Sequence, residues 1–105
     1  MVRINWTNQA VSDLKNVYDF IASDSKFYAK RKVSKKKLNT ELIKEHIRFG
    51  RMVPEFEQDD IREIIEGRYR IVYQIISSTE VDILTIHNSA KENLTIKVKK
   101  DNDQT

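Results

Sequence analysis

Apolar residues recur along the chain at two spacings, and these spacings divide it into helices and strands. Residues 8–23 carry apolar side chains three and four positions apart, which predicts an amphipathic helix. Polar residues then interrupt the pattern, and a second helix is expected over about residues 26–48. Its apolar stripe is thin, because Lys36 and Thr40 occupy positions where the spacing calls for apolar residues. We expect the Lys36 methylenes to lie on the edge of the core and its ammonium to remain in water.

Strands are predicted on both sides of this helical pair. The alternating stretch "VRINW" suits a first strand, and three more are expected at 61–65, 69–76 and 81–87. Gly50 is expected to end the second helix as a left-handed cap. Tight turns between the last three strands require antiparallel neighbours. The predicted fold class is α+β: an N-terminal strand, an antiparallel helical hairpin and a three-stranded antiparallel meander, with the helices on one face of the sheet.

One domain accounts for this pattern. A chain of 105 residues is long enough to bury a stable core without disulfides or metal. Apolar residues become sparse toward the C-terminus. We therefore expect the domain to span residues 1–94 and a polar C-terminal tail to span residues 95–105.

The strand at 69–76 contains a charged residue, and its alternation predicts where that charge points. Successive side chains of a strand face opposite sides of the sheet. The tyrosines and isoleucines at odd positions are therefore expected under the helices. Arg70 and Gln74 are expected on the second face, which antiparallel sheets of this kind commonly leave open. An open face that mixes polar and apolar residues is typical of a surface that binds a partner.

Charge is distributed unevenly along the chain, although the formal net charge is only +3. Lys and Arg dominate residues 26–51, where Glu41 and Glu45 are the only acidic residues. Residues 52–66 are acidic, with Arg62 as their only base. The basic block predicts an anionic partner, such as nucleic acid, a membrane surface or an acidic protein segment, or else a solvated helix face.

Several classes of site and location are excluded by what the sequence lacks. There is no cysteine, and the two histidines lie far apart, so thiolate and histidine metal sites are not expected. Two glycines cannot make a glycine-rich phosphate loop. The N-terminus is too polar for a signal peptide, and no apolar run approaches the length of a membrane span. These features predict a cytoplasmic protein with no cofactor, no metal and no membrane partner.

Three segments resemble a known group of proteins: "GRMVPEF", "IREIIEGRYRIVYQI" and "VDILTIHNSAK". They resemble the RelE/ParE toxin superfamily of type II toxin–antitoxin modules, and "WTNQAVSDLKNVYDFIASDS" fits the same pattern. The resemblance covers about residues 3–91 and is closest to ParE-like (plasmid stabilisation) toxins. RelE-like members carry lysines before the "YRIVYQ" strand and a tyrosine after the last strand, and both are missing here. His87 matches the histidine that often ends the last strand of ParE-like members.

The resemblance implies a toxin that inhibits growth by binding its target, DNA gyrase, and that is neutralised by a cognate antitoxin. On this interpretation the protein is not an enzyme. Two alternatives stay open. The first is a RelE-like endoribonuclease that cuts mRNA on the ribosome. The second is a non-toxic, degenerate relative that acts as a binding module. A homodimer also stays open.

Candidate residues differ between these functions. If the protein is a ribonuclease, Arg70 would clamp the phosphate, His87 would transfer a proton and Lys91 would add positive charge. Otherwise Arg70 is a structural residue paired with Glu63 or Asp82, and His87 is a hydrogen-bonded residue at the end of a strand.

If the protein acts by binding, its basic helix is the expected contact for an acidic antitoxin segment that folds as it wraps the toxin. The predicted partner-binding residues are Lys32, Lys35, Lys36, Lys37, Arg62 and Gln74.

Overall fold

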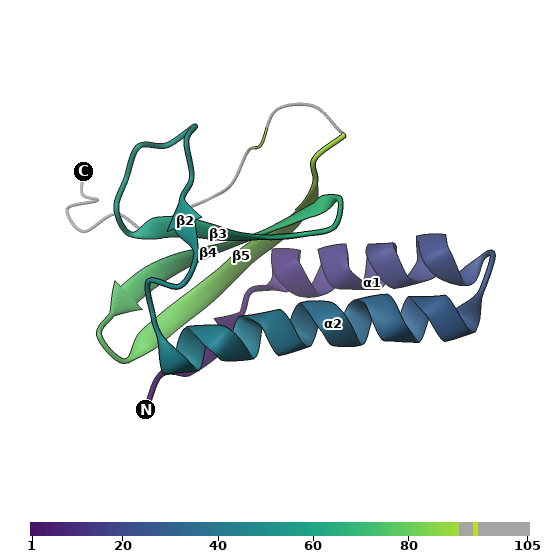
Figure 1. Cartoon of the computed structure of the whole chain (residues 1–105), viewed down its shortest axis with the longest axis horizontal. Coiled ribbons are helices and arrows are strands. Elements are labelled where there is room, and N and C mark those ends of the chain that lie inside the picture. The colour runs from purple at the N-terminus through teal and green to yellow at the C-terminus, as the bar shows by residue number, and fades with distance from the viewer. Residues whose placement is uncertain (91–93, 95–105) are drawn as a thin grey trace.

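The computed structural model describes residues 1–90 and Leu94, and its chain order is strand, two helices and four strands (Figure 1). The elements are β1 (Arg3–Trp6), α1 (Asn8–Ala22), α2 (Lys26–Glu45), β2 (Arg51–Met52), β3 (Ile61–Glu66), β4 (Tyr69–Ser77) and β5 (Glu80–Asn88). The two helices form an antiparallel hairpin along one side of the sheet, and its tip projects beyond the sheet (Figure 1). Neither of these helices has both the length and the apolar character that crossing a membrane requires. The predicted α+β fold class is confirmed.

The sheet has the strand order β1-β5-β4-β3-β2. As predicted, β3, β4 and β5 form an antiparallel meander. β1 pairs with β5 in a parallel arrangement, which was not predicted. The two strands are far apart in the sequence, and no tight turn links them to indicate the pairing. This pairing ends at Ile83, and among the described residues no strand lies beside the remainder of β5 on that side.

Each helix begins at a hydroxyl residue. Thr7 precedes α1 and its side chain accepts a hydrogen bond from the Ala10 N–H, and Ser25 does the same for the Tyr28 N–H of α2. Such caps satisfy backbone donors that lack a partner within the helix. The two caps therefore fix where each helix of the hairpin starts.

The main core lies between the helices and the sheet. Ile71 and Tyr73 are fully buried there, and Tyr69 and Ile75 pack at its edge, as the strand alternation predicted. The buried members of this cluster are Ala10, Val17, Ile43, Ile64, Ile71, Tyr73, Val81, Ile83 and Ile86.

The second face of the sheet is covered, so the prediction of an open face is wrong. A second apolar cluster comprises Val53, Ile61, Val72, Leu84 and Leu94, with Phe56 packed against it. Val53 and Phe56 of this set come from the loop between β2 and β3. Burying their apolar side chains against the sheet is favourable and holds the loop over it. Gln74 is only 3% exposed beneath this layer.

The end of α2 also differs from the prediction. The helix ends at Glu45, and His46 caps it in an extended conformation with φ −150°. Gly50 is therefore not a left-handed cap; it is needed for close packing instead. A Cβ at this position would lie 2.6 Å from the Glu63 carbonyl oxygen and 2.8 Å from the Tyr73 ring. Gly67, with φ +62°, makes the predicted tight turn between β3 and β4.

The predicted C-terminal tail, residues 95–105, lies outside the described residues, as does Lys91. Leu94 is described and is buried against the second face of the sheet. The domain boundary predicted at residue 94 therefore stays a prediction.

Candidate functional site

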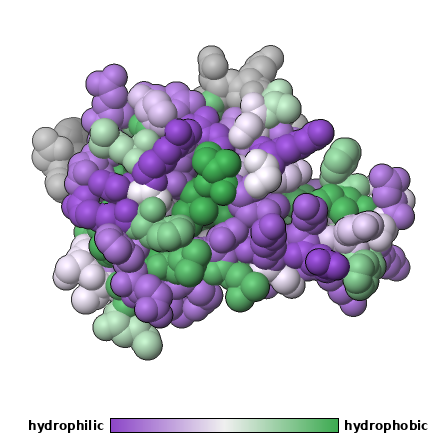
Figure 2. Space-filling view, in the orientation of Figure 1, coloured by the Kyte–Doolittle hydropathy of each residue, from purple (hydrophilic) through white to green (hydrophobic). Residues whose placement is uncertain are grey.

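The basic side of α2 contains three of the predicted partner-binding residues. Lys32, Lys35 and Lys37 are all exposed. The Lys35 ammonium lies 4.0 Å from a Glu66 carboxylate oxygen, but the Lys35 side chain is 67% exposed and remains accessible. Figure 2 shows a mainly hydrophilic surface that apolar side chains interrupt over the middle of α2. The partner-binding role of these lysines stays a prediction, and their geometry leaves them free to make such contacts.

Lys36 is placed differently, and the prediction that its ammonium stays in water is wrong. The side chain is 1% exposed, and its Nζ donates a hydrogen bond of 2.6 Å to Glu66 Oε1. The ammonium also lies 4.3 Å from the centroid of the Tyr69 ring, within range of a cation–π interaction. A charge buried to this degree needs a partner, and here the partner comes from the end of β3. Lys36 therefore ties α2 to the sheet and has no surface to offer a binding protein.

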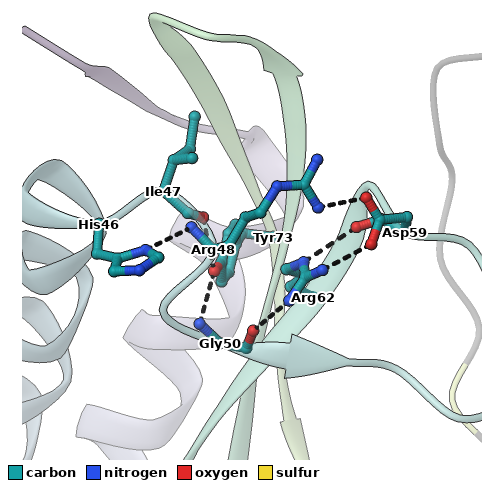
Figure 3. Close-up of polar contacts among 7 residues, drawn as sticks. All are labelled: His46, Ile47, Arg48, Gly50, Asp59, Arg62 and Tyr73. Atoms are coloured by element: carbon teal, nitrogen blue, oxygen red, sulfur yellow. Dashed lines mark hydrogen bonds and ion pairs between the residues drawn. The ribbon is translucent and has the colours of Figure 1, made fainter.

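Arg62 and Gln74 are engaged within the fold as well. Arg62 donates to the carbonyl of Gly50 (2.9 Å) and to both the carbonyl and the carboxylate of Asp59 (3.0 and 2.7 Å; Figure 3). Its side chain is 15% exposed. Gln74 donates to Asp60 Oδ2 at 2.9 Å. Both predicted contacts thus lie beneath or within the β2–β3 loop rather than on an open face.

Tyr73 of β4 holds the segment between α2 and β2 in place. Its hydroxyl accepts a hydrogen bond from the Gly50 N–H (2.8 Å) and donates one to the Ile47 carbonyl (3.0 Å; Figure 3). Burial raises the pKa of this hydroxyl above its usual value, because the charged form would be desolvated. These bonds hold the segment after α2 against β4, and this segment leads through β2 into the β2–β3 loop.

Arg70 and His87, the two described residues of the candidate nuclease site, are direct neighbours across β4 and β5. The Arg70 guanidinium is already occupied. It donates to both carboxylate oxygens of Glu55 (2.7 and 2.8 Å) and, through Nε, to Glu63 Oε1 (2.5 Å). The structural alternative for Arg70, pairing with Glu63 across the sheet, is confirmed.

The positive and negative charges in this network neutralise one another. The bidentate bond from Arg70 lowers the pKa of Glu55 to about 2, and the same bond raises the pKa of Arg70. Glu63, whose side chain is fully buried, accepts a second ion pair from Arg51 at 2.7 Å. Two arginines thus face two carboxylates. A phosphoryl transition state needs uncompensated positive charge, and Arg70 in this arrangement does not supply it.

His87 lines a hollow between α1 and the part of β5 beyond its pairing with β1. The hollow has a volume of about 590 Å³, and Gln9, Asp13 and Asn16 of α1 line it. Asp13 accepts hydrogen bonds from the Ile86 N–H (3.1 Å), the Thr85 hydroxyl and the Gln9 amide. Asp13 thereby satisfies a backbone donor that β1 leaves unpaired, and its carboxylate adds negative charge to the hollow. Within the part of the chain that the structure covers, no group of three or more potential ligands is arranged to hold a metal ion.

The sequence analysis did not identify Glu55 as a partner of Arg70 or Asp59 as a partner of Arg62. The acidic character of residues 52–66 was the feature that could have indicated these pairs. Its carboxylates neutralise bases that come from several other elements. The pairs are Glu55 with Arg70, Asp59 with Arg48 and Arg62, Glu63 with Arg51 and Arg70, and Glu66 with Lys35 and Lys36. Two exposed bases of α2 also have acidic neighbours, because Lys35 lies 4.0 Å from Glu66 and Lys44 lies 3.0 Å from Glu41.

Comparison with known proteins agrees with this fold. The family described as "ParE toxin of type II toxin-antitoxin system, parDE" matches residues 4–92. Among solved structures, the chain is similar to one from the chromosomal ParDE TA system of P. aeruginosa, with a TM-score of 0.68 and 21% sequence identity. That alignment covers 84% of this chain and 96% of the other, and it supports the shared fold. A search of curated proteins gave no match. Because the family match spans most of its length, the chain belongs to the ParE toxins of type II toxin–antitoxin systems.

Proposed function

We propose that the protein arrests growth by binding DNA gyrase, that it does not cut RNA, and that a cognate antitoxin neutralises it. Membership of the ParE toxin family supports the role as a toxin. The gyrase target rests on the resemblance to ParE-like toxins.

The observation that carries the choice of binding over cleavage is the state of Arg70. All three of its guanidinium nitrogens donate to carboxylates, and Glu63 among those carboxylates is fully buried. Freeing Arg70 for a phosphate would leave Glu63 buried with a weaker set of partners, which costs free energy. Asp13 and Glu55 add negative charge near His87. The site is thus poorly suited to stabilise a pentavalent phosphate.

The antitoxin contact is supported by the exposed bases of α2. Lys32, Lys35 and Lys37 are exposed on one helix, and Lys35 also lies 4.0 Å from Glu66. An acidic segment is the partner that this charge distribution favours.

Two assays with the purified protein separate binding from cleavage. In the first, the protein is titrated into a supercoiling reaction with gyrase and relaxed plasmid, and we expect supercoiling to be inhibited. In the second, the protein is added to ribosomes engaged on mRNA, and we expect the mRNA to remain intact. Cleaved mRNA that becomes intact with Arg70→Ala, tested in a variant whose circular dichroism matches the wild type, would establish the nuclease instead.

A further inference from the structure

The hollow between α1 and the end of β5 is large enough to take a side chain from a partner. Its volume is about 590 Å³. Gln9, Asn16 and Phe20 line it from α1, and His87 and Asn88 line it from β5. The three residues of α1 are exposed, so a ligand can reach the hollow from solvent.

Asp13 supplies a carboxylate to this lining, and its charge is hydrogen-bonded but not neutralised. It accepts hydrogen bonds from the Gln9 amide (2.7 Å), the Thr85 hydroxyl and the Ile86 N–H (3.1 Å), all of which are neutral donors. A carboxylate has about four lone-pair positions. Among the described residues, Oδ1 receives only the bond from Gln9, so it can accept a further donor.

The carboxylates on the other side of the sheet and at the end of β3 differ from Asp13, because cations neutralise them. Glu55 and Glu63 pair with Arg70, and Glu66 pairs with Lys36. Within the described part of the chain, no lysine or arginine lines the hollow, and no cation pairs with Asp13. A partly buried carboxylate without a cation of its own favours a positively charged ligand.

An aromatic ring at the hollow favours one kind of cation. Phe20 lines the hollow and is 76% exposed, so one face of its ring is available to a ligand. A guanidinium is planar, stacks on aromatic rings and presents several N–H donors in a fixed geometry, whereas an ammonium is a compact and strongly hydrated charge. The mixture of an aromatic ring, a carboxylate and side-chain amides therefore suits a guanidinium better than an ammonium.

We propose that this hollow binds an arginine side chain of a partner protein. The guanidinium would donate to Asp13 Oδ1 and stack on Phe20, and its remaining N–H groups would donate to the side-chain carbonyl of Asn16. The site is separate from the exposed lysines of α2. It would bind arginine whether or not the protein inhibits gyrase, so a negative result in the supercoiling assay leaves it standing.

Other ligands fit the hollow less well. The Asp13 carboxylate would repel an oxyanion such as phosphate. No group of three or more potential metal ligands is found among residues 1–90 and Leu94. Free arginine carries an α-carboxylate, which would add a second negative charge near Asp13. An arginine within a peptide chain has no such group and is therefore the favoured ligand.

The test is an NMR titration of the full chain with N-acetyl-arginine amide, which has the guanidinium but no free carboxylate. We expect the backbone amide signals of Asn16, Ile86 and His87 to shift and to saturate, with a dissociation constant on the order of millimolar. N-acetyl-citrulline amide has nearly the same shape without the charge, and it should bind at least about tenfold more weakly. N-acetyl-lysine amide should also bind more weakly than the arginine compound.

Variants of α1 separate the hollow from its surroundings. Asn16→Lys places a cation of the chain's own one helical turn from Asp13 and should weaken binding of the arginine compound by more than about tenfold. The matched control Ser12→Lys makes the same change in charge at an exposed position of α1 that does not line the hollow, and it should change the affinity by less than about threefold. Phe20→Ala removes an exposed ring and should weaken binding by about three- to fivefold.

Several results would overturn the proposal. The first is the absence of a saturable shift with N-acetyl-arginine amide at tens of millimolar. Equal binding of the citrulline compound would show that the charge of Asp13 is not used. Equal weakening by Asn16→Lys and Ser12→Lys would place the binding outside the hollow. If free arginine binds more tightly than its blocked form, the hollow takes a small molecule and not the side chain of a partner protein.

Discussion

Lys36 and Glu66 form an ion pair that the fold shields almost completely from water, with side chains 1% and 5% exposed. We predict that Lys36→Met destabilises the protein by about 3–5 kcal/mol, because it leaves the Glu66 carboxylate buried without its main partner. Urea unfolding followed by circular dichroism measures this. The double variant Lys36→Met/Glu66→Leu should recover much of the loss, since it removes the charge as well. A single variant as stable as the wild type would show that Lys35 or water compensates Glu66.

Glu55 ties the β2–β3 loop to Arg70, and its effect on stability should depend on pH. Hydrogen bonding from Arg70 lowers the pKa of Glu55 from 4.5 to about 2. A lowered pKa in the folded state stabilises the fold above the unfolded pKa, and that stabilisation is lost as the pH falls through the folded pKa. Because Glu55 is 43% exposed, solvent screens the pair, and we expect about 1 kcal/mol or less at pH 7.

The measurement is the difference in free energy of unfolding between wild type and Glu55→Gln as a function of pH. The difference should be constant above about pH 5 and should shrink between pH 4.5 and about 2, where the wild-type carboxylate becomes protonated. A difference that does not change across this range would mean that Glu55 contributes through packing rather than through its charge.

Among the elements, Asp13 joins α1 to the part of β5 that lies beyond its pairing with β1. Its carboxylate accepts the Ile86 N–H and the Thr85 hydroxyl. Asp13→Ala should destabilise the protein by about 1–3 kcal/mol, because it leaves a partly buried backbone donor without a partner. Amide exchange at Ile86 should accelerate in the same variant. Asp13→Asn keeps an acceptor oxygen and should retain the protection, so equal exchange in both variants would contradict this role.

The elements themselves follow from local patterns, and their contacts do not. Helical periodicity predicted α1 and α2, and alternation along "YRIVYQII" predicted that Ile71 and Tyr73 face the helices. The cover on the second face was missed because Val53 and Phe56 lie in an irregular loop, where no periodicity indicates which surface they bury. Likewise, nothing local to Lys36 indicates that a carboxylate thirty residues away lies within reach.

For the candidate site, the sequence predicted the residues but not their contacts. Arg70 and His87 were singled out by residue type, and the strand register brings them together. The sequence could not show that the Arg70 guanidinium is already bound to carboxylates. Glu55 reaches Arg70 from the β2–β3 loop, and the path of that loop depends on the packing of Val53 and on the hydrogen bonds of Arg62. The chemistry of a residue depends on its neighbours, and here those neighbours are distant in sequence.

At the scale of the whole molecule, a toxin that acts by binding should not depend on a residue suited to proton transfer. We predict that His87→Ala, expressed at the wild-type level, still arrests growth, because no chemical step would rest on the imidazole. Colony counts after induction measure this. Loss of toxicity with unchanged folding and expression would favour the ribonuclease, since removing a general acid or base commonly costs about 10²–10⁴ in rate.

A growth curve after induced expression, with and without the protein of the adjacent gene, shows whether this chain is a growth-arresting toxin with its own antitoxin. We predict that induction alone stops growth within a few generations and that co-expression of the adjacent protein restores it. Growth that continues unchanged after induction, with the folded protein present in the cells, would contradict the claim and leave the fold as a binding module without toxicity.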